Sequence, residues 1–431
     1  MGNIRQKALF IIDHVFYKGA FLEEELEILR QSKWEDRDFN FVRELATGVV
    51  RHRSYLDYVI KKKSTIKFKK IHKIILTILE MGIYQYYFMD KVPVHALVSE
   101  SVELAKIYGN RGSVSFVNGM LRNIVKEKPM SVTVEQPMER LAIQYSHPDF
   151  YVKEIYDKYG EKFTEKLLKA NNQQPKFTLR VNTLKTDRED LVRRLEEEGF
   201  HAHPGNLKDS LIVENPIGIF SSDSFMDGDF YVQDEASMKV SEIVDPKPEE
   251  KILDLCAAPG GKSTHMAAMM KDRGRIIACD ISDYKLSLIR ENCKRLGITS
   301  IVCKKNDGVL ERKEFINAFD KVLIDAPCSA IGLYRRKPDI KWNRSLESLK
   351  ELSHIQYQLL TRGASYVKIG GRLIYSTCSI SELENEKILE AFLKNHPHYT
   401  LERIQGNQIL KLFPHIDGTD GFSIFSLKRI R

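Results

Sequence analysis

Two cysteines that each follow a predicted buried strand are the residues of this chain best suited to covalent chemistry. Cys328 lies in Asp325-Ala-Pro-Cys-Ser and Cys378 in Tyr375-Ser-Thr-Cys-Ser. A thiolate is the usual biological nucleophile for addition to C6 of a pyrimidine, and a second thiol nearby could assist release of the base. Asp325 ends the strand before Cys328, so its carboxylate is expected in the same cleft. The pattern predicts a cysteine-dependent enzyme that modifies a nucleobase, and it ranks neither thiol above the other.

The other four cysteines, Cys256, Cys279, Cys293 and Cys303, are expected to be inert. They have neither the short paired spacings of a zinc site nor a companion cluster of histidines. We therefore expect reduced thiols, no metal and no disulfide framework.

A glycine-rich turn, Cys256-Ala-Ala-Pro-Gly-Gly-Lys262, connects a predicted strand at 252–255 to a predicted helix at 263–271. Glycine lets a ligand approach the backbone closely beyond the carboxyl end of a strand. The turn lacks the Gly-x-Gly-x-x-Gly and Walker spacings, which argues against a dinucleotide or a triphosphate. A Gly-Gly pair is about as often a plain structural turn, so this loop alone leaves both interpretations open.

Two acidic residues favour a ligand at that turn. Asp280 ends the second strand, where a carboxylate can accept hydrogen bonds from both hydroxyls of a ribose, and Asp307 follows the third strand, within reach of an adenine. The alternative for Asp280 is a cap on the helix that starts at Ser282. Acids in this register, without a phosphate-binding motif, suit an adenosine that carries no phosphate. We therefore predict S-adenosylmethionine as the cofactor.

A basic segment directly after the first cysteine loop is a candidate for RNA contact. It contains Arg335, Arg336, Lys337 and Lys341, with Trp342 next to the last of them. Basic side chains can hold phosphates while an aromatic ring stacks on a base. A second basic cluster, at 61–73, is about equally explained by a solvated helix face.

The elements that must position these residues fall into three regions. Residues 1–130 have apolar side chains at helical spacing, as in Ile4, Ala8, Ile11, Ile12 and Val15, and predict an all-helical domain. Residues 138–235 mix predicted helices with short strands and predict a small α+β domain. Residues 236–431 alternate apolar strands with helices, which predicts a mostly parallel, doubly wound sheet.

Composition limits the remaining choices. The chain has 431 residues, 42% of them hydrophobic, and a formal net charge of +8. No stretch approaches the roughly 20 apolar residues of a membrane helix, and no signal peptide starts the chain, so we expect a cytosolic protein without a membrane partner. The positive charge favours a nucleic-acid partner only weakly.

Several motifs together resemble a known family, the RNA 5-methylcytosine methyltransferases of the Nol/Nop/Sun group. In the last region these are Asp254-Leu-Cys-Ala-Ala-Pro-Gly-Gly-Lys262, Asp325-Ala-Pro-Cys-Ser329, Arg336-Lys-Pro-Asp-Ile-Lys-Trp342, Tyr375-Ser-Thr-Cys-Ser379 and Glu384-Asn-Glu386. Upstream, Val92-Pro-Val-His-Ala96 and Phe116-Val-Asn-Gly-Met-Leu-Arg122 are similar to a NusB-like domain fused to bacterial small-subunit rRNA enzymes of this group. Leu179-Arg-Val-Asn182 and Gln233-Asp-Glu-Ala-Ser237 continue the match, so it covers nearly the whole chain.

The resemblance implies a fold, a reaction and a role for each matching residue. It implies a NusB-like RNA-binding domain, a linker domain and a Rossmann-like S-adenosylmethionine-dependent methyltransferase domain. The implied substrate is a cytosine of 16S ribosomal RNA, cytosine 967 in the usual rRNA numbering, methylated at C5 by a monomeric enzyme. Cys378 would be the nucleophile, Cys328 the thiol that assists release, and Asp325 a catalytic partner of the base. The implied cofactor contacts are Cys256, Ala257, Ala258, Pro259, Gly260, Gly261, Lys262, Asp280, Asp307 and Asp325.

One position departs from the family pattern, because Ser423 stands where the family usually carries another aromatic residue. One alternative function also stays open. The helical domain could act as an antitermination-like or assembly module of a non-catalytic RNA-binding factor. The intact pair of cysteines argues against that alternative.

Overall fold

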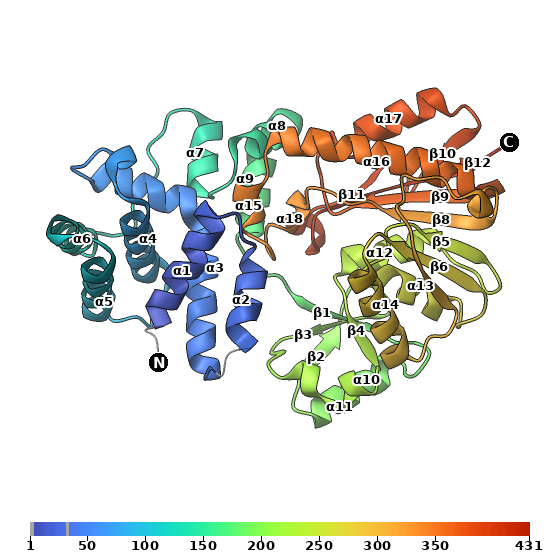
Figure 1. Ribbon diagram of the computed structural model, residues 1–431, viewed down its shortest axis with the longest axis horizontal. Helices are drawn as coiled ribbons and strands as arrows, with labels where there is room; N and C mark the ends of the chain where they lie inside the picture. The colour runs from blue at the N-terminus through green and yellow to red at the C-terminus, as the bar shows by residue number, and fades with distance from the viewer. Residues whose placement is uncertain (1–3, 32–33) are drawn as a thin grey trace. The chain divides into compact units, whose positions relative to one another are not determined.

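The computed structural model describes residues 4–31 and 34–431, and the chain forms two compact units. The first comprises the described residues up to Gln173 together with Tyr334–Ser345. The second comprises Gln174–Leu333 and Leu346–Arg431. The blue-to-teal helices of Figure 1 belong to the first unit, and all the labelled strands belong to the second.

The first unit is built of helices, as the apolar periodicity predicts for residues 1–130, and it also contains helices from the range assigned to the α+β domain and from Tyr334–Ser345. They are α1 (Ile4–Tyr17), α2 (Leu22–Gln31), α3 (Asp36–Lys63), α4 (Lys73–Phe88), α5 (Val94–Tyr108), α6 (Arg111–Ile124), α7 (Pro137–Gln144), α8 (Asp149–Tyr159), α9 (Glu161–Asn171) and α15 (Ile340–Asn343). Helix α4 is buried on every side from Ile75 to Gln85, which explains why its sequence is apolar almost all round. The amphipathic helices around it bury one face each, such as Ala8, Leu9 and Ile12 of α1.

The short segment Tyr334–Ser345 is held by this helical unit through specific hydrogen bonds. The Trp342 indole donates to the Val50 carbonyl oxygen at 2.7 Å, and the backbone amide of Leu22 donates to Asp339 Oδ2 at 3.3 Å. The buried ring of Tyr334 meets Tyr151 edge-on, with centroids 4.9 Å apart. The helical unit is therefore completed by residues that lie more than 150 positions further along the chain.

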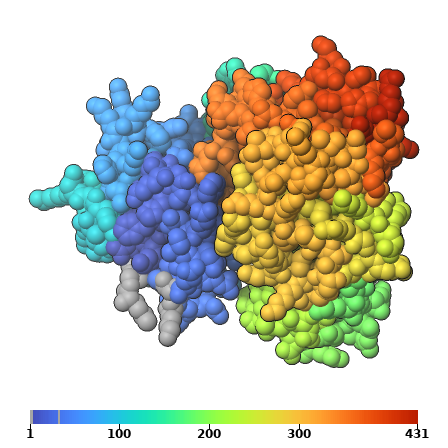
Figure 2. Space-filling model, turned by 45° about the vertical axis from the view of Figure 1, so that its right-hand side comes forward, coloured from blue at the N-terminus to red at the C-terminus, as the bar shows by residue number. Residues whose placement is uncertain are grey.

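The second unit begins with a small antiparallel sheet in the order β2-β3-β1-β4. Its elements are β1 (Phe177–Val181), β2 (Ala202–Pro204), β3 (Ser210–Val213), β4 (Phe230–Val232), α10 (Arg188–Glu197) and α11 (Asp223–Met226). Leu179, Leu211 and Phe230 of the sheet pack with Leu191 and Leu195 of α10 in a core of their own. Figure 2 shows these residues in green as one lobe beside the yellow surface of the larger sheet and its helices.

The larger sheet has eight strands and confirms the doubly wound prediction. Its strands are β5 (Lys251–Asp254), β6 (Arg275–Asp280), β7 (Ile301–Lys305), β8 (Phe319–Asp325), β9 (Val367–Thr377), β10 (Tyr399–Glu402), β11 (Leu410–Leu412) and β12 (Phe422–Arg429). The order is β10-β12-β9-β8-β5-β6-β7, with β11 paired to β12. Strands β9, β8, β5, β6 and β7 are parallel, whereas β12 runs antiparallel to β9 and to β10. The antiparallel edge was not anticipated from the sequence.

Helices cover both faces of this sheet. They are α12 (Glu235–Val244), α13 (Gly261–Met269), α14 (Asp283–Leu296), α16 (Leu346–Tyr366), α17 (Glu386–Asn395) and the short α18 (Pro414–Asp417). Figure 1 shows α16 and α17 on one face and α12, α13 and α14 on the other. A parallel sheet covered on both faces presents the ends of its strands to a ligand, and the carboxyl ends form the usual ligand edge.

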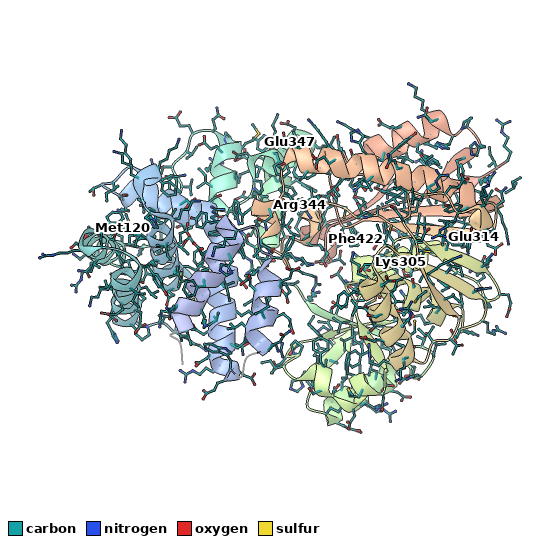
Figure 3. All side chains as sticks on the ribbon, in the orientation of Figure 1. Met120, Lys305, Glu314, Arg344, Glu347 and Phe422 are labelled. Carbon is teal, nitrogen blue, oxygen red and sulfur yellow. The ribbon has the colours of Figure 1, made fainter. Side chains whose placement is uncertain are left out.

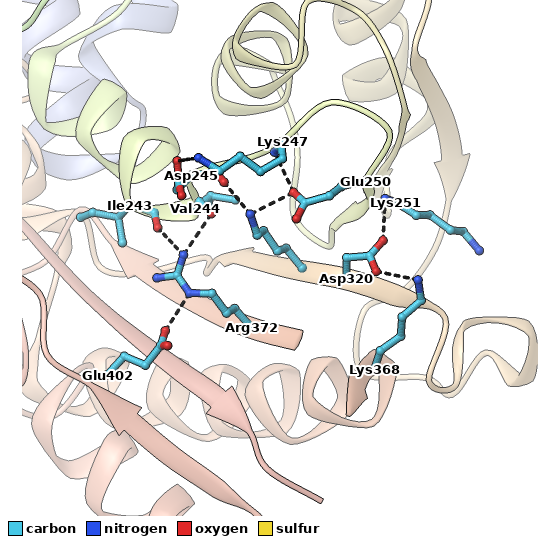
Figure 4. A network of polar contacts seen from close by, with 11 residues as sticks. Ile243, Val244, Asp245, Lys247, Glu250, Lys251, Asp320, Lys368, Arg372 and Glu402 are labelled. Atoms are coloured by element: carbon cyan, nitrogen blue, oxygen red, sulfur yellow. Dashed lines mark hydrogen bonds and ion pairs between the residues drawn. The ribbon is translucent and has the colours of Figure 1, made fainter. Parts of the chain in front are cut away.

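The opposite, amino edge of the sheet is closed by ion pairs (Figure 4). Arg372 donates from Nε to Glu402 Oε2 at 2.7 Å and from Nη1 to two carbonyl oxygens at the end of α12. Lys368 pairs with Asp320 at 2.6 Å, and Lys321 pairs with Glu250 at 2.9 Å. Because these charges are mutually satisfied, this edge has a structural role and leaves the carboxyl edge for chemistry.

Candidate active site

The two candidate thiols lie against each other at the carboxyl edge of the larger sheet. Cys328 Sγ is 3.1 Å from Cys378 Sγ, although the residues are 50 positions apart. The parallel pairing of β8 with β9 causes this, because Asp325 stands opposite Ser376 in the register and each thiol follows within three residues. Both cysteines are partly exposed, so a ligand can reach them.

The surroundings of Cys328 favour the protonated form of its thiol. The hydrogen bond to Cys378 and burial raise the pKa of the Cys328 thiol well above its usual value, and the Glu384 carboxylate adds to the effect. Cys328 therefore keeps its proton and can donate it to the Cys378 sulfur. A sulfur that accepts such a hydrogen bond is stabilised as a thiolate, which is the reactive form.

A buried carboxylate joins the two cysteine loops. Glu384 is fully buried, and its Oε1 accepts from the backbone amide of Ser329 at 2.8 Å and from Gln356 Nε2 at 3.0 Å. Its Oε2 accepts from the hydroxyls of Ser329 and Ser379. Four donors around one carboxylate satisfy it without a cation. Since Ser329 follows Cys328 and Ser379 follows Cys378, Glu384 fixes the spacing of the two thiols.

A second set of hydrogen bonds shapes the turn after Cys378. Asn385 Nδ2 donates to the carbonyl oxygens of Ser379 at 3.2 Å and Ser381 at 2.8 Å, and Thr377 Oγ1 donates to Asn385 Oδ1 at 2.8 Å. Ser423, the residue that departs from the family pattern, is fully buried and donates to the Ser379 carbonyl oxygen at 2.8 Å. The Ser423 hydroxyl thus gives the Ser379 carbonyl oxygen a hydrogen-bond donor, which an aromatic side chain at this position would not provide. Glu384 and Asn385 were recognised from the sequence only as part of a family motif, and no role was predicted for either residue.

Asp325 and Lys262 form the ion pair of the site. Lys262 Nζ lies 2.5 Å from Asp325 Oδ2, and Ser376 Oγ donates to Asp325 Oδ1 at 2.7 Å. Burial alone would lower the pKa of Lys262, but the negative charges of Asp325 and Cys378 outweigh it and raise that pKa. The ammonium also lies 5.3 Å from the ring centroid of Phe422, which Figure 3 labels at the start of β12. Lys262 therefore carries a positive charge that interacts with both Asp325 and Cys378.

The glycine-rich turn has a backbone conformation that requires glycine at Gly260. Gly260 has φ of +100°, and a Cβ there would lie 3.3 Å from Ile289 of α14, so a side chain would be both strained and crowded. Helix α13 starts at Gly261, directly after the turn. Asp254, at the end of β5, accepts a hydrogen bond from Ser263 Oγ at 2.5 Å and so links the strand before the turn to the helix after it. Burial raises the pKa of Asp254 to about 7.

A buried arginine of the small sheet also supports the turn. Arg180 of β1 donates to the Gly261 carbonyl oxygen, to the Gln233 side chain and, at 2.9 Å, to Thr264 Oγ1. It is 1% exposed. The motif Leu179-Arg-Val-Asn182 thus has a structural reason, since it links the small sheet to the glycine-rich turn. Sequence reasoning did not single out this arginine.

The two acids predicted to hold adenosine stand beyond β6 and β7. Asp280 Oδ1 accepts from the backbone amide of Ser282 at 3.2 Å, and Asp307 Oδ1 accepts from that of Val309 at 3.2 Å. Among residues 4–31 and 34–431, no hydrogen bond reaches the second oxygen of either carboxylate. The cap of α14 is the Ser282 side chain, which accepts from the Lys285 amide, so the alternative role of Asp280 as the cap is wrong. Acceptors for hydroxyl and amino groups, beside an open backbone turn, fit an adenosine.

The remaining cysteines have the environment of inert thiols. Cys279 and Cys293 are buried, and burial raises the pKa of each thiol to about 12. Burial also raises the pKa of Cys303, and raises that of Cys256 well above its usual value. These thiols stay protonated at neutral pH, as the sequence analysis expected.

The basic segment divides into surface and buried residues. Lys337 is exposed and Arg336 half-buried, whereas Arg335 is 5% and Lys341 1% exposed. Lys341 Nζ donates to Asn172 Oδ1 at 2.7 Å and to the Arg51 carbonyl oxygen at 3.3 Å, all within the helical unit. Burial and the neighbouring Arg51 lower the pKa of Lys341 well below its usual value. The expectation of four basic side chains on an exposed loop is therefore corrected, because two of them are interior groups.

The second basic cluster stays on the surface, at the end of α3 and the loop after it. Lys61, Lys62, Lys67, Lys69 and Lys70 are exposed, and Lys63 pairs with Glu127 at 2.6 Å.

Among residues 4–31 and 34–431, no group of His, Cys, Asp and Glu side chains could hold a metal ion. None of the helices in that same part of the chain has both the length and the apolar character needed to span a bilayer.

Three protein-family models match consecutive parts of the chain. Residues 241–428 match the model of the 16S rRNA methyltransferase RsmB/F family, residues 2–126 match the NusB family, and residues 147–219 match the ferredoxin-like domain of RsmF/B-like methyltransferases. These matches confirm the predicted helical, α+β and methyltransferase folds.

Similar proteins cover nearly the whole chain. The probable ribosomal RNA small subunit methyltransferase B of Bacillus subtilis is 37% identical over 93% of both chains, and that of Synechocystis is 33% identical over all of both. The crystal structure of PH0851 matches all of both chains with a TM-score of 0.81 and 26% identity. A methyltransferase homologue from Pyrococcus horikoshii matches with a TM-score of 0.62 and 28% identity, over 69% of this chain and all of that one.

Proposed function

We propose a specific reaction for this chain, which belongs to the 16S rRNA methyltransferase RsmB/F family and is thus an rRNA methyltransferase. It transfers a methyl group from S-adenosylmethionine to C5 of a cytosine in 16S ribosomal RNA, cytosine 967 in the usual numbering. The reaction passes through a covalent bond between Cys378 and C6 of the base. We also propose that the enzyme acts in the cytoplasm as a monomer.

The observation that carries the proposal is the pair of thiols 3.1 Å apart. Methyl transfer to a nitrogen or oxygen needs no thiol nucleophile, because those atoms already have a lone pair. C5 of cytosine has none, so a nucleophile must first add at C6. A thiolate with a protonated thiol as its hydrogen-bond partner suits that addition and the later elimination.

The residues beyond β5, β6 and β7 fit S-adenosylmethionine, which when bound supplies an electrophilic methyl group on a sulfonium. Asp280 would accept from its ribose hydroxyls and Asp307 from its adenine. Gly260 and Gly261 let the ligand lie directly on the backbone, because Gly260 has a positive φ and a Cβ on Gly261 would lie 3.1 Å from Tyr231. No phosphate-binding sequence follows the turn, in agreement with a ligand that has no phosphate.

The chain's own groups then account for each change at the base. The Cys378 sulfur forms a bond to C6, and the electron pair of the C5–C6 double bond moves so that C5 becomes nucleophilic. Asp325, held by Lys262 and Ser376, keeps lone pairs with which it can accept from the exocyclic amine or from a protonated N3 as charge develops there. After methylation, C5 loses its proton to solvent, the C5–C6 double bond re-forms and the C6–S bond breaks. The Cys328 S–H stabilises the departing sulfur.

Two cysteine variants test the mechanism. Cys378→Ala should abolish transfer of a tritiated methyl group to rRNA. Cys328→Ala should bind RNA and then remain attached to it, visible as a protein–RNA band that survives denaturing electrophoresis. Full turnover by both variants would exclude the thiol mechanism.

A substrate analogue provides the complementary test. With 5-fluorocytidine in the transcript, C5 carries fluorine in place of a proton, so elimination stops and wild-type protein should accumulate as a covalent adduct. Cys303→Ala is the matched control and should behave as wild type. Absence of methyl transfer and of the adduct, in a protein that still binds RNA, would instead favour the alternative of a non-catalytic RNA-binding factor.

A further inference from the structure

The helical unit contains a cavity that the methylation mechanism does not use. Its volume is about 630 Å³, within the range of pockets that take a small-molecule ligand or one nucleotide. It is lined by His52, Tyr55, Tyr87, Phe88, Pro129, Met130, Ser131, Val132, Gln144, Tyr145, Lys169, Asn172 and Gln173. All of these residues belong to the first unit, so the cavity is a feature of that unit alone.

One wall of the cavity is a stack of aromatic rings. Phe88 is 40% exposed, and its ring stacks on His52 at a centroid distance of 4.4 Å and on Tyr84 at 5.1 Å. Burial and the positive charges of Lys341 and Arg51 lower the pKa of His52 to about 3, so this ring is neutral at physiological pH. Tyr55 meets Phe88 edge-on at 6.2 Å. A neutral stack that ends in an exposed ring offers a planar ligand a place to extend it.

Other residues that line the cavity supply polar groups without negative charge. The side chains of Gln144 and Gln173 are exposed and form no hydrogen bond with any described residue, and Lys169 is also exposed. No carboxylate occurs among the lining residues, all of which lie in the described part of the chain. Amides can pair with the edge of a base, and an ammonium can hold the phosphate next to it.

We propose that this cavity binds one unstacked nucleotide of the RNA substrate, with the base on Phe88 and a neighbouring phosphate on Lys169. The occupant is RNA rather than a peptide, because aromatic stacking, free amides and an acid-free lining with a lysine are the features that recognise single-stranded RNA. The inference rests on the proposed function only in taking RNA as the partner. It adds a binding site in the helical unit, distinct from the cysteines.

Binding of a fluorescent single-stranded RNA of about 12 nucleotides to the full-length protein tests the proposal. Phe88→Ala should weaken binding roughly 5- to 100-fold, since stacking of one base is lost. Phe88→Trp should restore binding, which a merely structural role for Phe88 does not predict. Lys169→Gln should lower the slope of log K against log salt by about 0.7.

Matched controls are available in the same unit. Phe21 is 42% exposed and does not line the cavity, and Lys166 is an exposed lysine on the same helix as Lys169. Phe21→Ala and Lys166→Gln should bind RNA as wild type. If Phe88→Ala and Lys169→Gln bind RNA as these controls do, the cavity is not an RNA site.

Methyl transfer measured on the same variants separates the two proposals. If wild-type protein methylates rRNA but Phe88→Ala binds RNA normally, the cavity inference fails and the proposed function stands. If RNA binding depends on Phe88 but wild-type protein transfers no methyl group, the function fails and the cavity inference stands.

A second inference comes independently from the distance between the thiols. Cys328 and Cys378 are 3.1 Å apart and both are partly exposed, so closing the gap by roughly 1 Å would give a disulfide of about 2.05 Å. We infer that a peroxide links these two cysteines. The Cys378 thiolate attacks the O–O bond and becomes a sulfenic acid as hydroxide leaves. The Cys328 sulfur then attacks Cys378, the S–OH bond breaks, and the thiol proton leaves with the hydroxide as water. The two thiols are oxidised together, and one peroxide is reduced to two waters.

Thiol counting and peptide mass spectrometry test this inference on the full chain. One equivalent of hydrogen peroxide should lower the number of free thiols from six to four and link the peptides that contain residues 328 and 378. Methyl transfer should be lost and should return with dithiothreitol. Cys303→Ser should give the same link, and Cys328→Ser should give none. A link between other cysteines, or oxidation beyond the sulfenic acid without a link in wild-type protein, would refute it.

Discussion

Replacing Glu384 by glutamine should reduce catalysis more than it reduces the amount of folded protein. This carboxylate is fully buried and joins the loops of Cys328 and Cys378 through Ser329 and Ser379. Glutamine has nearly the same shape. In the wild-type protein the Ser329 and Ser379 hydroxyls donate to the Glu384 carboxylate, whereas the glutamine NH₂ group is itself a donor and cannot accept from them. The substitution therefore breaks the bridge between the loops while it leaves the packing intact.

The magnitude follows from the hydrogen bonds that are lost. Two bonds to a charged acceptor are worth about 1.5–3 kcal/mol each, and the hydroxyls recover part of this by rotating, so we expect a loss of about 2–4 kcal/mol in unfolding free energy. Release of the two loops should also let the sulfurs separate. A displacement of about 1 Å can cost roughly 100-fold in rate, so kcat should fall about 10- to 100-fold with little change in KM for RNA.

Urea unfolding and steady-state methyl transfer to rRNA measure the two effects. Glu390→Gln, an exposed residue of α17, is the matched control and should change neither. A Glu384→Gln protein that loses stability but keeps wild-type kcat would refute the role of Glu384 in spacing the thiols. An unchanged stability would refute the account of its hydrogen bonds.

Three further predictions concern the rest of the molecule. Arg180→Lys loses hydrogen bonds to the cofactor turn and should weaken S-adenosylhomocysteine binding about tenfold by calorimetry, as expected for about 1.4 kcal/mol; unchanged affinity would contradict it. Burial, and then the Asp57 carboxyl, raise the pKa of Glu80 well above its usual value, so the ionised form disfavours folding and stability falls as pH rises through that raised pKa. Glu80→Gln should therefore raise the melting temperature by several degrees at pH 8 and by less at pH 5, and an equal shift at both would count against it. Lys337→Gln should lower the slope of log K for RNA binding against log salt by about 0.7, whereas Lys341→Met should leave that slope unchanged. The reverse result would show that Lys341, and not Lys337, contacts RNA phosphates.

Local sequence patterns were sufficient for the elements that hold the site. The strand predicted at 252–255 lies within one residue of β5, and the strands predicted to end at Asp280 and Asp325 are β6 and β8, which end at those residues. This worked because a buried parallel strand is a continuous apolar run and because glycine and acidic residues mark its carboxyl end. Strands β10 to β12 were not predicted. Their antiparallel pairing could not be predicted either, because a short apolar run does not indicate the direction in which it pairs.

The sequence by itself determined which residue types reach the carboxyl edge of the sheet: two thiols, an aspartate, a lysine and a glycine turn. Only the tertiary structure decided that Cys328 and Cys378 lie in contact, that Glu384 joins their loops, and that Lys341 is an interior group of the helical unit. The physical reason is that strand and helix signals act over a few residues, whereas proximity depends on the pairing of β8 with β9 and on packing between segments far apart in the chain.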